Sequence, residues 1–147
     1  MNELGITLPE ALPPAANFVS VVVVDRIAYV SGHGPQRPEG TFDFIGRLGE
    51  DLTVEEGREA ARLSSLNALA SLRAEIGSLD NVKRIVKLLG MVNSAPDFGD
   101  HPRVINGASD LLVEIFGDAG RHARSAVGFV NLPMGIAVEI EMIAELH

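Results

Sequence analysis

The chain has 147 residues, of which 46% are hydrophobic and 5% aromatic, enough for one globular domain with an aliphatic core. Its formal net charge of −8 argues against a nucleic-acid partner, because affinity for phosphate backbones is built on lysine and arginine. The lack of cysteine excludes disulfide bonds, thiolate metal sites and a cysteine nucleophile. With no membrane-length apolar run and no secretory signal at the N-terminus, we expect a cytoplasmic protein that does not bind membranes.

The first third of the chain predicts mostly extended structure. Residues 1–16 are rich in proline and alanine and predict a lead-in without regular structure. Two apolar, β-branched runs at 17–24 and 27–31 are separated by two residues, which predicts a tight hairpin. A loop follows, in which residues 41–45 can form a short strand.

The middle of the chain predicts a helix and then a strand. Thr53 is followed three residues later by Glu56, which is the pattern of a capping box at a helix start. Apolar positions then recur at steps of three and four, and Gly77 ends the helix. Residues 82–93 follow as a strand-like run.

A second helix is predicted after a loop. Asp100 is expected to cap it, Pro102 suits its first turn and Gly117 ends it. Its buried stripe is formed by Val104, Ala108, Leu111 and Ile115. Because helices alternate with strands, we predict one α+β domain over residues 1–147, a two-layer arrangement of a mixed β-sheet packed against two helices.

The last third, from 123 to 146, predicts two extended runs joined by a tight Asn-Leu-Pro-Met-Gly turn. Matching the apolar faces of such a hairpin places Arg124 and Ala126 on the other face, beside Glu139 and Glu141. A guanidinium and two carboxylates on one surface form a candidate site. From spacing alone, the favoured reading is an exposed Arg124–Glu141 salt bridge worth roughly 0–1 kcal/mol.

Three segments together, AYVSGHGP, GMVNSAPDF and ARSAVGFVNLP followed by AVEIEMIAEL, resemble the Rid (reactive intermediate deaminase) family, also called YjgF. The resemblance covers about residues 15–143, and the stretch 101–128 is similar to one branch, with a longer C-terminal helix region. It implies a chorismate-mutase-like fold and a homotrimer with clefts between subunits. It also implies hydrolysis of enamine/imine compounds such as 2-aminoacrylate to 2-keto acids and ammonia, without a cofactor.

The resemblance also implies roles for residues. Arg124 would hold the substrate carboxylate, and a planar guanidinium fork suits bidentate pairing with such a group. Glu139 would position or activate the attacking water; as a general base it needs a raised pKa, which burial at a subunit interface can provide. The alternative for Glu139 is an exposed strand glutamate paired with a neighbouring cation. Ser31, Gly32 and Asn93 match other positions that line the cleft. For Ser31 and Gly32 the alternative is an ordinary turn, and for Asn93 the start of the turn that follows it.

Three positions depart from the family pattern. Phe18 stands where the family has tyrosine, so the pocket lacks a hydroxyl; Ala126 replaces a cysteine and His33 a glutamine. Phe18 is either a pocket wall or core, and His33 is either near the pocket mouth or a solvated loop residue. The other histidines show no ligand spacing, so no metal site is expected.

Two further functions stay open. The first is a non-catalytic module that binds a small carboxylate such as a 2-keto acid, which the missing tyrosine hydroxyl favours. The second is the ribonuclease activity that has been attached to some family members, against which the acidic charge counts.

Overall fold

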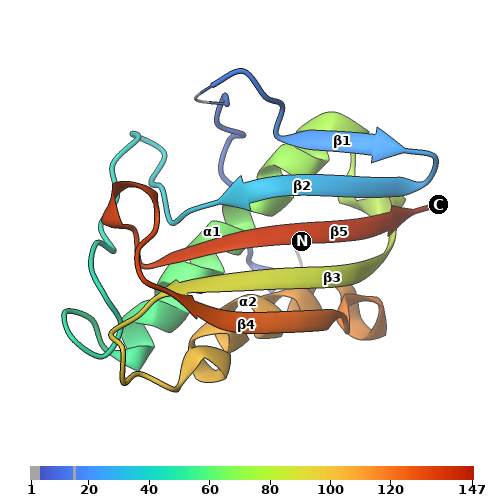
Figure 1. The fold of residues 1–147 in the computed structure, drawn as a ribbon. Coiled ribbons are helices and arrows are strands. Elements are labelled where there is room, and N and C mark those ends of the chain that lie inside the picture. Colours follow the sequence, from blue (N-terminus) through green and yellow to red (C-terminus); the bar gives the residue numbers. More distant parts are fainter. Residues whose placement is uncertain (1–3, 15) are drawn as a thin grey trace.

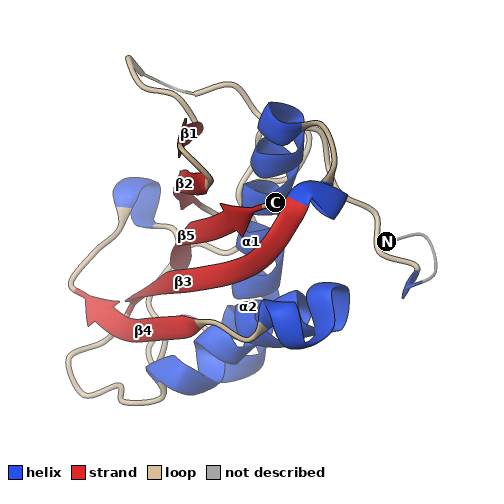
Figure 2. Cartoon of the chain, turned by 90° about the vertical axis from the view of Figure 1, so that its right-hand side faces the viewer, coloured by secondary structure: helices blue, strands red, loops and turns tan. Residues whose placement is uncertain are grey.

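The computed structural model describes residues 4–14 and 16–147, which form a five-stranded sheet with a pair of helices packed against one face (Figures 1 and 2). The strands are β1 (Val21–Val24), β2 (Ile27–His33), β3 (Val82–Asn93), β4 (Ala123–Phe129) and β5 (Val138–Leu146). The helices are α1 (Val54–Ile76) and α2 (His101–Phe116), with short 3₁₀ turns between elements. The predicted two-layer α+β domain is confirmed. Neither helix is long and apolar enough to cross a membrane.

The order of strands across the sheet is β1-β2-β5-β3-β4, so the predicted hairpin of residues 123–146 is wrong. β3 lies between β4 and β5, parallel to the first and antiparallel to the second (Figure 1). Helix α2 carries the chain back to the start of β3, which makes β4 parallel to it. The connection 130–137 then passes the end of β3 before β5 begins, which a tight turn between neighbouring strands cannot do.

The N-terminal hairpin is confirmed, with Val24 paired to Ile27, although its first strand begins at Val21 rather than at 17. Residues 41–45 are not a strand; they contribute only isolated bridges to Gln36 and Ile136. Residues 1–3 and 15 of the predicted lead-in lie outside the described residues. Leu8, which is described, is buried in the core.

The helix ends follow the sequence closely. Thr53 Oγ1 accepts a hydrogen bond from the Glu56 amide (3.2 Å), and Glu56 Oε1 accepts one from the Thr53 amide (3.0 Å), so the capping box is confirmed. Helix α2 begins after Asp100, but this carboxylate makes no cap hydrogen bond. It pairs instead with Arg103, at 3.3 Å.

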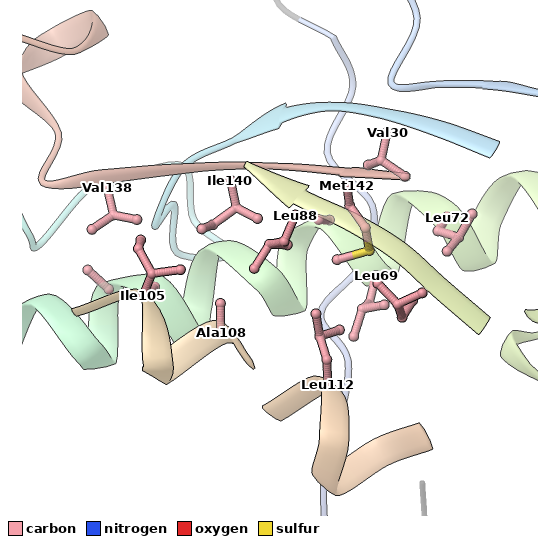
Figure 3. Packing of buried hydrophobic residues seen from close by; sticks show 14 of the residues in the cluster. Val30, Leu69, Leu72, Leu88, Ile105, Ala108, Leu112, Val138, Ile140 and Met142 are labelled. Carbon is pink, nitrogen blue, oxygen red and sulfur yellow. The ribbon is translucent and has the colours of Figure 1, made fainter. Parts of the chain in front are cut away.

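The core lies between the sheet and the two helices. Leu88, Ile140 and Met142 point from β3 and β5 toward Leu69 of α1 and Leu112 of α2 (Figure 3). Each such burial contributes about 1.5–3 kcal/mol.

The opposite face of the sheet is covered by neither α1 nor α2, which both lie on the other side (Figure 2). On it Val22 is 47% exposed, Tyr29 48%, Val127 40% and Phe129 41%. The molecule therefore has one filled layer and one bare, partly apolar sheet surface.

Candidate functional site

A cavity of about 370 Å³ opens where the end of β2, the start of β5 and the lead-in come together beside α1. Five of the residues singled out in the sequence line it: Phe18, Ser31, Gly32, His33 and Glu139. Its other walls come from Gln36, Phe42, Asn67, Pro133, Met134 and Ile136, together with residues of the lead-in. The structure thus gathers most of the predicted substrate-binding set in one place.

Gly32 and Glu139 meet across β2 and β5. The register between these strands is irregular from Val30 to His33, a bulge-like distortion that re-aims the end of β2. As a result, a side chain at position 32 would collide with the Glu139 carboxylate. Glycine therefore leaves open the space that this carboxylate occupies, which is a packing role beyond that of an ordinary turn.

Glu139 is one of two titratable groups in this cavity whose pKa is shifted, the other being His33. Partial burial raises the pKa of its carboxyl above the ordinary value, and the like charge of Glu141 raises it further. No ion pair formed by residues 4–14 and 16–147 includes Glu139. A carboxylate of this kind takes up a proton more readily than an exposed glutamate.

His33 ends β2 and is half-buried, so the solvated-loop reading is wrong. Its Nδ1 lies 2.6 Å from the Ser31 carbonyl oxygen, and its Nε2 lies 2.8 Å from Ser71 Oγ. Burial lowers the pKa of the ring, so the neutral form is favoured. Because a carbonyl only accepts, Nδ1 carries the proton and Nε2 accepts from the Ser71 hydroxyl. The ring is therefore fixed at the cavity wall.

Sequence reasoning missed Asn67. Its amide donates to the Gly34 and Gln36 carbonyls, both at 2.9 Å, and so holds the chain that follows β2. A signal was present, because Asn67 is a polar residue within the apolar face of α1, and buried polar groups need partners.

Asn93 and Ala126 lie outside the cavity lining. Asn93 is 2% exposed, and its Nδ2 donates to the carbonyls of Gly135 (3.4 Å) and Ile136 (3.2 Å). Ala126 packs against the core beneath α2. Both residues therefore contribute to the structure around the cavity and not to its lining.

Arg124 lies on the other side of the sheet from Glu139. It pairs with Leu88 of β3, whose side chain is fully buried beneath the helices. Its Nη1 donates to Ser109 Oγ of α2 at 3.0 Å, and its Nη2 donates to the Pro102 carbonyl at 3.3 Å. The predicted shared face is therefore wrong, because it depended on the hairpin that does not form. An Arg124–Glu141 cross-strand salt bridge is absent for the same reason.

Within the described residues, no group of three or more histidine, aspartate or glutamate side chains is close enough together to hold a metal ion. The cavity instead offers one carboxylate, one neutral imidazole, two serine hydroxyls and amide groups beside apolar walls. Such a lining suits a small polar organic molecule, held by hydrogen bonds and worked on by proton transfer.

Residues 1–146 match the family model described as "YjgF/chorismate_mutase-like, putative endoribonuclease". Protein TCP17 of Trypanosoma cruzi is 47% identical over 148 residues, covering 100% of this chain and 92% of that protein. Atu1372 of Agrobacterium tumefaciens, a protein of unknown function, superposes with a TM-score of 0.92 at 41% identity, over 99% of this chain and 89% of that one. A Shewanella oneidensis protein described as a "putative endoribonuclease" superposes with a TM-score of 0.93 at 37% identity, over 99% of this chain and 95% of that one. The chain therefore belongs to the YjgF/chorismate-mutase-like family, the Rid family that its motifs resemble.

Proposed function

We propose that this protein is an enamine/imine deaminase that hydrolyses small 2-imino acids, such as the imine of 2-aminoacrylate, to 2-keto acids and ammonia. The observation that carries the proposal is the Glu139 carboxylate, which lines the cavity without an ion-pair partner among the described residues and has a raised pKa. A base is most effective when its pKa lies near the working pH, and burial moves Glu139 in that direction.

In this reaction Glu139 takes a proton from a water molecule as the water oxygen forms a bond to the imine carbon. Glu139 passes that proton to the imine nitrogen, which gives a neutral carbinolamine. The carbinolamine hydroxyl then gives its proton to the amine through Glu139, the C–N bond breaks with release of ammonia, and the C–O bond becomes the ketone of the 2-keto acid. Phe18, Ser31, Gly32 and His33 form the walls around the reacting carbon, whereas we assign Asn93 and Ala126 to structural support. Because simple imines also hydrolyse in water, positioning supplies much of the acceleration required.

Arg124 contributes only if a second copy of the chain supplies it. In one copy its guanidinium and Glu139 lie on opposite faces of the sheet, but β4 is an edge strand and its arginine is partly exposed. The bare sheet face, with Val22, Tyr29 and Val127 exposed, supports association, because extended apolar surface marks interfaces. We therefore propose a homotrimer in which each cleft combines Glu139 of one copy with Arg124 of the next.

A coupled assay tests this function. 2-Aminoacrylate is generated in situ by a dehydratase, and pyruvate release is followed with wild type, Arg124→Ala and Glu139→Gln. We expect wild type to accelerate release, and both variants to lose most of the acceleration while staying folded. Glu114→Gln, which alters a surface carboxylate paired with Arg62, is the charge-matched control and should behave as wild type.

If wild type binds a 2-keto acid in an Arg124-dependent manner but does not accelerate release, the protein is a carboxylate-binding module. The descriptions of the family and of the Shewanella relative name a second activity, RNA cleavage. The same preparations should therefore be incubated with RNA. RNA cleavage that Glu139→Gln abolishes, without imine hydrolysis, would replace our proposal.

A further inference from the structure

Arg124 is held by a chain of hydrogen bonds that the proposed reaction does not explain. Its Nη1 lies 3.0 Å from Ser109 Oγ, and that oxygen lies 2.9 Å from His122 Nε2. His122 Nδ1 in turn lies 2.6 Å from the Gly120 carbonyl oxygen. Three elements thus meet here: α2 supplies the serine, the segment before β4 supplies the histidine, and β4 supplies the arginine.

When the His122 ring is neutral, the direction of each hydrogen bond from the Gly120 carbonyl to Arg124 follows from the groups involved. The Gly120 carbonyl only accepts, so His122 Nδ1 carries a proton. In the neutral ring Nε2 then has only a lone pair, so the Ser109 hydroxyl must donate to it. This leaves the Ser109 oxygen to accept from Arg124, which can only donate. The Ser109 hydrogen therefore points toward His122, and its lone pairs point toward the guanidinium.

The surroundings of His122 favour the neutral ring that this arrangement needs. Burial lowers the pKa of the imidazole, and the positive charge of Arg124 lowers it further, against the opposing effect of the Gly120 carbonyl. A neutral ring also avoids a second positive charge beside the guanidinium.

The second anchor of Arg124 is the carbonyl of Pro102, which accepts from Nη2 at 3.3 Å. Two acceptors on different turns of α2 therefore fix the plane of the guanidinium. Among the described residues, the other N–H groups of Arg124 have no hydrogen-bond partner, and a guanidinium fork suits a carboxylate. Fixing a flexible arginine before binding reduces the entropy lost when the ligand arrives.

We propose that Ser109 and His122 are positioning residues that orient Arg124 for the carboxylate of a 2-imino or 2-keto acid. The inference rests on the proposed function, because it takes Arg124 to be the group that receives this carboxylate. Neither Ser109 nor His122 touches the substrate; both act through the guanidinium. A purely structural role for the same residues would change stability but leave the balance between KM and kcat unaltered.

Kinetics and binding separate these roles. Ser109→Ala and His122→Leu should raise KM, and the Kd for 2-oxobutanoate measured by calorimetry, about tenfold, as expected for one lost positioning hydrogen bond. kcat should stay within about twofold, because the reacting carbon is served by Glu139. His122→Gln should restore most of the affinity, since its amide oxygen can accept from Ser109.

Ser64→Ala is the matched control, because among residues 4–14 and 16–147 this helical hydroxyl bonds only to the Ala60 carbonyl of its own helix. It should leave KM and Kd unchanged. A loss of kcat alone in Ser109→Ala, or equal effects in Ser109→Ala and Ser64→Ala, would overturn the inference.

A measurement without ligand tests the hydrogen bonds from His122 through Ser109 to Arg124, which we call the relay, separately from the proposed function. In ¹⁵N NMR of the wild-type protein at neutral pH, His122 should show the Nδ1–H tautomer, and rotation about the Arg124 Cζ–Nη bonds should be slow. Ser109→Ala should speed that rotation. If Ser109→Ala leaves the Arg124 rotation unchanged, the relay does not hold the guanidinium, whatever the activity. If the relay is present but wild type neither binds nor converts these acids, the proposed function is wrong and the relay stands.

Discussion

The Glu139 carboxylate occupies the space that a side chain at position 32 would need, so Gly32 and Glu139 define one another's position across β2 and β5. The contact depends on the irregular register of these strands after Val30. It brings the carboxylate against backbone, where it is half-buried, and this burial is the main reason that its pKa is raised. A glycine and a glutamate distant in sequence therefore form a single structural unit.

Gly32→Ala tests this unit. The added methyl group must displace the Glu139 carboxylate, so we expect deaminase activity to fall by about 10²-fold, the loss typical of a catalytic group moved by roughly an ångström. Gly99→Ala is the control, because a methyl group there meets nothing within 4 Å. Pyruvate release and thermal unfolding of both variants are the measurements. Full activity in Gly32→Ala would show that the position of Glu139 is unimportant.

Arg124 and Glu139 should complement one another between copies. When Arg124→Ala and Glu139→Gln are unfolded, mixed in equal amounts and refolded, random assembly makes about one cleft in four intact if each cleft combines two copies. Activity should therefore return to about a quarter of wild type. No recovery, with mixed trimers verified by mass spectrometry, would place both residues in one copy's site or outside catalysis.

The pH dependence of kcat/KM should report Glu139. A general base acts when deprotonated, so kcat/KM should rise with pH through the raised pKa of this carboxyl. Glu141→Gln removes a like charge, so it should lower that pKa and move the rising limb to lower pH. Stopped-flow rates from about pH 4 to about pH 9 provide the profile. A rising limb that Glu141→Gln leaves in place would remove Glu139 from the role of base.

The raised pKa also has a consequence for stability. The folded protein binds the Glu139 proton more tightly than the unfolded chain does, so the free energy of unfolding falls as pH rises from the ordinary glutamate value through the raised one. Glu139→Gln has no carboxyl to ionise at this position, so its free energy of unfolding does not fall with pH for this reason. The variant should unfold at a higher temperature than wild type at about pH 7, and the difference should shrink toward about pH 4, where both states are protonated. Equal melting temperatures at neutral pH would contradict the burial.

A variant at Asn93 tests whether this residue stabilises the fold or contacts the substrate. Asn93→Ala removes the donors to the Gly135 and Ile136 carbonyls and should lower the free energy of unfolding by about 1–3 kcal/mol. The Gly135 carbonyl keeps its hydrogen bond from the Gly46 amide (2.9 Å), so the loss comes mainly from the buried hydrogen bond to Ile136. Among variants that remain folded at the assay temperature, KM should change little. Denaturant unfolding and steady-state kinetics check this, and a large rise in KM with normal stability would instead place Asn93 in contact with substrate.

Local patterns predicted the elements well because they depend on neighbouring residues. The capping box at Thr53 and Glu56, the end of α1 at Gly77 and the strand at 82–93 are all confirmed. The pairing of β4 was not predictable in this way. The local sequence of an extended run does not specify which strand will pair with it. Here the crossover through α2 makes β4 parallel to β3 and places it beside that strand.

The cavity was only partly predictable for the same reason. Gly32 and Glu139 were recognised from family motifs, and the structure places them together. Arg124 was assigned to their face only through the hairpin, so one wrong pairing moved it across the sheet. The partners of Arg124, Ser109 and His122, carried no spacing signal, because three elements must pack before they meet.

The central place of β5 has a consequence for how the protein folds. β2 and β3 share no hydrogen bonds with each other, and each pairs with β5 instead. The β1–β2 hairpin and the β3–α2–β4 unit can form early as separate pieces, but the sheet joins only when the last strand in the chain inserts between them. Contacts between residues so far apart in sequence are slow to form, because the intervening chain must first lose its conformational freedom. During synthesis the β1–β2 hairpin and the β3–α2–β4 unit therefore cannot join into one sheet until residues 138–146 have been made.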